Sequence, residues 1–249
     1  AQSSSNTPYI GLNGRLIRVS VAHAGMPRVD YRDCLDTLRE DVLYLSEIVL
    51  DRLRLALTAF ERTDASMAQR VIDGDDEINA QYLDLEGDCV DLIALQQPVA
   101  SDLRFIAASF KILTDLERVG DLAVNLAEYS LTTSRTRLPE VDVQAIGTAV
   151  TEMLEDAMVA YADEDSALCY ELAERDELVD EQCAAASETV VRDLLARETA
   201  TGAVDREGLL ADISRLLLTL RDLERVGDHA VNIASRSLYM IQNDADLLY

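Results

Sequence analysis

The sequence predicts an all-α protein made of two tandem, pseudo-repeated three-helix bundles with long antiparallel helices. Three observations lead to this prediction. Apolar residues make up 49% of the 249 residues and only four residues are Pro, a composition that favours helices over sheets. Apolar residues also recur at spacings of three and four over long stretches. Finally, the heptapeptide DLERVGD occurs at 115–121 and again at 222–228, which indicates an internal duplication.

Residues 1–29 are expected to form an N-terminal extension that lies outside both bundles. The segment is richer in Gly and Pro than the rest of the chain. The Asn13-Gly14 pair stands between β-prone residues, which fits the turn of a small hairpin. A loose tail fits the same residues equally well.

The first bundle is predicted over residues 30–138. Its three helices are expected at about 30–62, 64–97 and 101–135. Thr63 and Asp64 interrupt the first apolar stripe, and either residue can cap the second helix. Pro98 ends that second helix, while Ser101 and Asp102 fit the cap or first turn of the third.

The second bundle is predicted over residues 139–249. Its helices are expected at about 140–162, 167–197 and 205–241. Residues 57–79 align with residues 158–180 at an offset of 101, which pairs Asp75 with Asp176 and Asn79 with Asp180. The simplest way for each copy to bury its apolar stripes is an antiparallel three-helix bundle.

The net charge of −25 limits the partners of the protein. Nucleic acid and anionic membrane surfaces would be repelled, because no run of Lys or Arg forms a local basic patch. Cations are the natural small partners of such a surface, and direct binding of phosphate is not expected unless a metal ion bridges it.

The remaining composition indicates a cytoplasmic protein. No apolar run approaches the length of about 18 residues that a membrane span needs, and the first residues do not resemble a signal peptide. Four cysteines lie far apart with no C-x-x-C pair, which predicts free thiols in a reducing compartment. These are Cys34, Cys89, Cys169 and Cys183.

The repeated heptapeptide suggests a cation site. Residues four apart share one face of a helix, so Glu117 lies beside Asp121 and Glu224 beside Asp228. Like charges at this spacing cost about 0.2–0.5 kcal/mol on an exposed helix, and apolar neighbours raise that cost. A nearby cation is therefore expected.

The arginines within the heptapeptide do not fill that role in the sequence-based prediction. Arg118 and Arg225 point about 100° away from the preceding Glu. They are expected to pair with Asp115 and Asp222, three residues earlier.

A metal ion is the other candidate, because the second helix of each bundle carries another pair of oxygen ligands at the same spacing. If neighbouring helices are antiparallel, four oxygen-bearing side chains converge in each bundle. The predicted ligands are Asp75, Asn79, Glu117 and Asp121 in the first bundle, and Asp176, Asp180, Glu224 and Asp228 in the second. All-oxygen sets suit Mg²⁺, Mn²⁺, Ca²⁺ or Fe ions, and Zn²⁺ ranks lower because His and Cys are scarce. Gly120 and Gly227 would let the helices approach closely or leave room for a metal cluster.

Two other interpretations of the carboxylates remain open. They form either a solvated, salt-bridged face of a purely structural helical scaffold or the site of a metal-dependent hydrolase. Catalysis has no visible nucleophile beyond metal-bound water, so the protein is not expected to be an enzyme.

The sequence resembles the PhoU family of regulators of phosphate uptake and phosphate signalling. The resemblance is carried by DLERVGD with AVNLAE, by DLERVGDHAVNIA, by RVIDGDDEIN and by QQPVASDLRFIA, in the family's order. It implies a cytoplasmic homodimer, associated with the membrane only through its partners. Its expected role is that of an adaptor between the phosphate-transporter ATPase and a sensor histidine kinase, which damps the starvation response when phosphate is plentiful.

The same resemblance implies metal binding. In some PhoU-like proteins the corresponding carboxylates hold multinuclear iron or zinc clusters. The ligands implied here are Asp75, Glu117 and Asp121 in the first half and Asp176, Asp180, Glu224 and Asp228 in the second. Because position 79 is Asn, the first site is expected to bind metal less strongly than the second.

Overall fold

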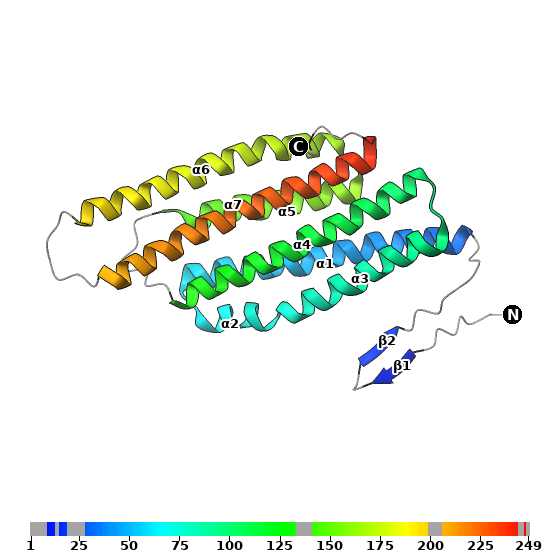
Figure 1. The fold of residues 1–249 in the computed structure, drawn as a ribbon, viewed down its shortest axis with the longest axis horizontal. Coiled ribbons are helices and arrows are strands. Elements are labelled where there is room, and N and C mark those ends of the chain that lie inside the picture. Colours follow the sequence, from blue (N-terminus) through cyan, green and yellow to red (C-terminus); the bar gives the residue numbers. More distant parts are fainter. Residues whose placement is uncertain are drawn as a thin grey trace.

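The computed structural model confirms the predicted architecture of two three-helix units. It describes residues 9–12, 15–18, 28–132, 141–198, 206–243 and 247. The helices run roughly along the long axis of the molecule, with α1, α3 and α4 on one side and α5, α6 and α7 on the other (Figure 1).

The N-terminal segment contains a short hairpin, as one of the two predictions for it proposed. Strand β1 (Tyr9–Leu12) pairs antiparallel with β2 (Arg15–Arg18), with Tyr9 opposite Arg18 and Leu12 opposite Arg15. The Asn13-Gly14 turn lies outside the described residues.

The first unit contains four helical segments. They are α1 (Arg28–Arg62), α2 (Ala65–Asp73), α3 (Asp75–Gln96) and α4 (Ala100–Thr132). Asp64 caps α2, because its Oδ1 accepts hydrogen bonds from the backbone N–H groups of Ser66 and Met67. Gln97 adopts a left-handed conformation, with a φ of 46°, where the chain turns from α3 into α4.

The prediction of one continuous second helix in the first unit was wrong. The helix breaks at Gly74, between α2 and α3. Glycine weakens a helix by about 1 kcal/mol relative to Ala, and Arg52 of α1 stabilises the break. Its Nη1 donates to the carbonyl oxygen of Arg70, in the last turn of α2, at 2.9 Å.

The second unit repeats the plan without that break. It contains α5 (Val143–Asp163), α6 (Ser166–Glu198) and α7 (Arg206–Gln242). Asp142 caps α5 by accepting a hydrogen bond from the backbone N–H of Ala145. Asp165 caps α6 by accepting from the backbone N–H groups of Ala167 and Leu168. Asp165 is the repeat counterpart of Asp64, so both copies use the same cap.

The two units share one apolar core, in which α4 packs against α7 and α1 packs against α5. Arg39 of α1 reinforces the second contact. It donates to the carbonyl oxygens of Tyr161 and Ala162 at the end of α5, pairs with Glu164 at 2.8 Å, and lies 4.9 Å from the ring centre of Phe105. A cation in this position satisfies the terminal carbonyl groups of the helix.

The cap of α2 provides a test of the fold. Replacing Asp64 with Ala removes the acceptor for two N–H groups and is expected to lower the free energy of unfolding by about 1 kcal/mol. The measurement is urea unfolding followed by circular dichroism. Asp64→Asn keeps an acceptor oxygen, so its free energy of unfolding should fall much less. An unchanged free energy of unfolding in Asp64→Ala would contradict the assignment of this cap.

Candidate functional site

The heptapeptides lie on α4 and α7, where these two helices pack together. The carboxylates of each heptapeptide lie on two different faces of its helix. Successive residues turn by about 100° around a helix, so the first Asp lies on a different face from the Glu and the last Asp. The later carboxylates of each heptapeptide share a face with the paired side chains of α3 or α6. The first aspartates reach across to the other unit.

The first carboxylate set consists of Asp75, Asn79, Glu117 and Asp121, and the structure brings these side chains together. Burial, followed by the negative charge of Asp121, raises the pKa of Asp75 and that of Glu117. The Asn79 amide donates to Oδ2 of Asp75 at 2.8 Å, which lowers the pKa of Asp75 in part. Gly120 allows α3 to approach closely, because its missing Cβ would lie 3.3 Å from Ile78.

Arg118 partly neutralises this first set, contrary to the prediction that it would pair with Asp115. Its Nε lies 3.5 Å from Oε2 of Glu117, and its Nη1 lies 3.4 Å from Oδ2 of Asp121. The long, flexible Arg side chain reaches the preceding Glu117 and Asp121 three residues later, which its Cα direction alone does not indicate. The first set is therefore a cluster with a cation already beside it.

The second carboxylate set consists of Asp176, Asp180, Glu224 and Asp228. None of the four forms an ion pair with another residue that the structure describes. Oδ1 of Asp176 is buried and accepts no hydrogen bond from the described residues. It lies in the space left by Gly227, 3.0 Å from where a Cβ would stand.

The second set is also more strongly perturbed. Burial and then the charge of Asp180 raise the pKa of Asp176 to about 6, with further contributions from Asp228 and Glu224. Burial and the same charge of Asp180 raise the pKa of Glu224 and of Asp228. Several carboxylates that disfavour one another's ionised form are a common sign of a functional site.

The first aspartate of each heptapeptide links the two units instead of pairing with the predicted arginine. Oδ1 of Asp115 on α4 lies 2.9 Å from Nδ1 of His229 on α7. Fully buried Asp222 on α7 accepts hydrogen bonds from Tyr129 and Asn125 of α4 at 3.1 and 3.3 Å. Asp222 does have an arginine partner, but it is the preceding residue, Arg221, at 2.8 Å.

Sequence reasoning missed the roles of three residues near these sets. His229 was assigned none, although it replaces Leu122 of the first copy and so marks a polar departure from the repeat. Tyr129 was assigned no polar role, although its hydroxyl donates to Asp222. Cys183 is buried beside the second set, and burial together with the charges of Glu224 and Asp180 raises its pKa to about 12.

The second set suits a hard cation by its donor chemistry. Its carboxylates form no ion pair with a described residue, although the charges of His229 and Arg225 lower the pKa of Asp228 in part. It also offers a buried oxygen of Asp176 that accepts no hydrogen bond from the described residues. In the metal-free protein, the raised pKa keeps the Cys183 thiol protonated at neutral pH. In the part of the chain that the structure describes, however, no three His, Cys, Asp or Glu side chains are already arranged to hold a metal ion. Metal binding by the eight named residues remains a prediction.

The PhoU domain family model matches the chain twice, over residues 42–130 and 143–237. The chain belongs to the PhoU family. The two matched segments correspond to the two helical units, each with one heptapeptide. No helix in the described ranges is long and apolar enough to cross a membrane.

Relatives and solved structures of the PhoU family match nearly the whole helical part of the chain. The phosphate-specific transport system accessory protein PhoU homolog of Pseudomonas aeruginosa is 31% identical over 211 residues, 84% of each chain. PhoU homolog 1 of Methanothermobacter thermautotrophicus is 33% identical over 218 residues, which cover 86% of this chain and 95% of that protein.

Two solved structures share this fold. The crystal structure of PhoU from Pseudomonas aeruginosa has a TM-score of 0.76 at 30% identity, covering 86% of this chain and all of that chain. The phosphate transport system regulatory protein PhoU from Streptococcus pneumoniae gives the same TM-score at 27% identity, over 86% of this chain and 98% of its own.

The raised pKa of Asp176 predicts a pH dependence. Because the folded state holds this proton more tightly than the unfolded chain does, the free energy of unfolding falls as pH rises from about 4 to about 6. Asp176→Asn is expected to stabilise the metal-free protein at pH 7.5 by about 1 kcal/mol, allowing for solvent screening of this half-buried group.

The test is urea unfolding in buffer with a chelator, at pH 7.5 and pH 4.5. The gain from Asp176→Asn should shrink at the lower pH. Asp84→Asn, on the exposed face of α3, is the matched control and should change stability little at either pH. A gain that does not depend on pH would show that ionisation of Asp176 is not its cause.

Proposed function

We propose that this PhoU-family protein is an accessory regulator of phosphate transport and acts as a metal-binding adaptor. It would connect the phosphate-transporter ATPase with a sensor histidine kinase in the cytoplasm, as a homodimer, and hold the starvation response down when phosphate is plentiful. The relatives named as phosphate-specific transport system accessory proteins support the role in phosphate transport, because they match across both helical units.

The observation that carries the metal-binding part is the second carboxylate set. Four carboxylates meet between α6 and α7 without a positive side chain paired to any of them in the described chain. Asp180 and Asp228 are exposed, whereas Asp176 and Glu224 are partly buried. An unpaired charge is costly to bury, and a hard cation would remove that cost at Asp176 and Glu224. Mg²⁺, Mn²⁺ and Fe ions suit these oxygens best and Zn²⁺ less well. A multinuclear cluster would draw on all four side chains.

The first carboxylate set would bind a cation more weakly. Arg118 already lies beside Glu117 and Asp121, and Asn79 already donates to Asp75. An incoming metal ion must therefore displace an arginine and an amide. This difference extends the expectation from the sequence, which rested on Asn79 alone.

The adaptor role is favoured over that of a hydrolase. A hydrolytic metal site needs a concave pocket with an open coordination position. None of the eight predicted ligands lines the cavity that the structure forms beside Gly74. We therefore propose that the carboxylates have a structural or switching role and that the protein is not an enzyme.

Metal binding is tested by removing the two α7 ligands together. Glu224→Gln with Asp228→Asn is expected to lose most of the metal of the second unit, measured by elemental analysis after loading with Fe, Mn or Mg. Metal bound only to the folded state stabilises it, so a chelator should lower the melting temperature of the parent protein and leave that of the double variant unchanged.

The matched control is Glu177→Gln with Glu181→Gln, two exposed carboxylates four residues apart on α6. It should keep the full metal content and its response to the chelator. Equal metal content in both double variants would show that the ligand assignment is incorrect.

The regulatory role is tested in cells that lack the gene. Loss of the protein is expected to switch on a phosphate-starvation reporter in phosphate-rich medium, and the parental gene should restore repression. Affinity purification followed by mass spectrometry, from phosphate-replete and phosphate-starved cells, should recover the transporter ATPase and a histidine kinase. A reporter that does not respond to deletion would contradict the proposed function.

A further inference from the structure

A cavity of about 590 Å³ lies between α1 and the junction of α2 with α3. It adjoins Asp75 of the first carboxylate set, but none of the eight predicted metal ligands lines it. It is lined by Asp51, Arg52, Leu55, Arg70, Asp73 and Gly74. Its volume falls within the range of about 300–1,000 Å³ that is typical of small-molecule sites. In a chain of net charge −25, two arginines that face one cavity are unexpected.

Arg52 is held in the cavity by its neighbours. Its Nη1 donates to the carbonyl oxygen of Arg70 at 2.9 Å, and its Nη2 pairs with Glu77 at 2.9 Å. The guanidinium group occupies the space where a side chain at Gly74 would begin, since a Cβ there would lie 1.3 Å from Nη1. Three of the five N–H donors of Arg52 are left without a partner in these contacts.

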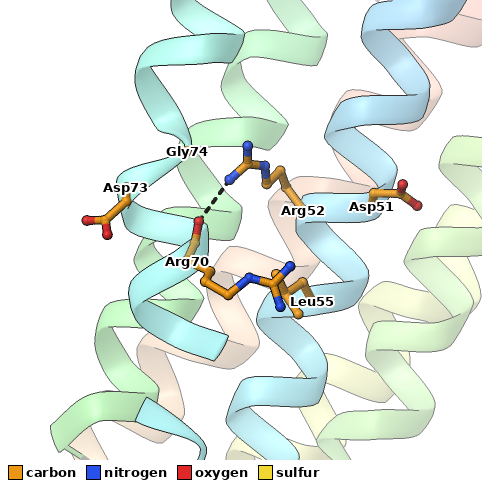
Figure 2. Close-up of a pocket in the computed structure, with 6 residues that line it drawn as sticks. All are labelled: Asp51, Arg52, Leu55, Arg70, Asp73 and Gly74. Carbon is orange, nitrogen blue, oxygen red and sulfur yellow. Dashed lines mark hydrogen bonds between the residues drawn. The ribbon is translucent and has the colours of Figure 1, made fainter. Parts of the chain in front are cut away.

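Arg70 forms no hydrogen bond or ion pair through its side chain with the described residues. Figure 2 shows its guanidinium group directed across the cavity toward Leu55, below that of Arg52. All five of its N–H donors are therefore available.

The two aspartates at the rim do not neutralise these arginines. Both carboxylates point away from the space between the helices in Figure 2. Asp73 accepts from Nε2 of Gln69 at 2.8 Å, and Asp51 pairs with Arg54 at 3.2 Å. The cavity thus presents guanidinium donors while its acidic groups are engaged elsewhere.

The second unit lacks this arrangement. At the repeat offset of 101, Gly74 corresponds to Arg175 and Arg70 to Glu171. α6 runs through this position without a break, and Arg175 pairs there with Asp156 of α5. The arrangement of Gly74, Arg52 and Arg70 therefore has no counterpart at the aligned positions of the second unit; in the first unit Gly74 both breaks the helix and makes room for Arg52.

We propose that this cavity binds a phosphate group, free or as the terminal group of a phosphate monoester. Guanidinium groups offer planar, paired N–H donors that match the oxygens of phosphate, and such charge-assisted hydrogen bonds are about twice as strong as neutral ones. The expectation that phosphate would need a bridging metal ion rested on the overall charge alone. The surrounding negative charge is screened over about 8 Å at physiological ionic strength, so partly buried Arg52 and exposed Arg70 can still attract an anion. This proposal rests on the proposed function only for the choice of phosphate as the first probe.

The test is isothermal titration calorimetry of the full chain, treated with a chelator, against inorganic phosphate. Arg70→Gln removes free donors without breaking any contact and is expected to weaken binding about tenfold or more. Arg32→Gln makes the same charge change on α1, about 30 Å along the helix from Arg52, and should bind like the parent. Gly74→Ala displaces the Arg52 guanidinium group and should also weaken binding.

Titrations with a second ligand distinguish free phosphate from a phosphate monoester. Tighter binding of glycerol phosphate than of inorganic phosphate would support a monoester, and the reverse order would support free phosphate. No phosphate binding by the parent, equal weakening by Arg70→Gln and Arg32→Gln, or equally tight binding of chloride would overturn the proposal. Because the titration uses neither metal nor partners, it can succeed even if gene deletion leaves phosphate regulation unchanged, and it can fail while that regulation holds.

Discussion

The packing of α4 against α7 places both copies of the heptapeptide at the centre of the molecule. Asp115 reaches His229 across this contact, and Asp222 reaches Tyr129. With the first aspartates directed across the interface, the helical repeat turns the later Glu and Asp of each heptapeptide toward the facing helix of the same unit. The packing of α4 against α7 therefore aligns the two units and positions both carboxylate sets.

The two units share this geometry but differ in the charged and polar side chains beside their carboxylate sets. In the first unit Arg118 and Asn79 compensate the carboxylates, whereas in the second unit no described cation pairs with them. Carboxylates that raise one another's pKa destabilise the folded state when they ionise. A protein retains such a cost most readily where function requires it, which distinguishes the second set from an ordinary acidic surface.

The same divergence appears at the helix break. Gly74 admits Arg52 from α1 in the first unit, while Arg175 of α6 reaches back to Asp156 of α5 in the second. The positive charge of Arg52 also lowers the pKa of Asp75, opposing the effect of burial. Through this single residue the arginine-lined cavity is electrostatically connected to the first carboxylate set.

The sequence by itself determined the helical class, the duplication, a cap at Thr63 or Asp64, and the carboxylate pairs, because these follow from the helical period and from local hydrogen bonding. Only the tertiary structure decided which neighbour each charged group meets. The partner of Asp115 and the insertion of Arg52 at Gly74 depend on how helices rotate and pack against one another, and the partners of Arg118 depend on the conformation of its side chain. Long, flexible side chains can reach several partners at similar cost, and spacing along the chain does not choose among them.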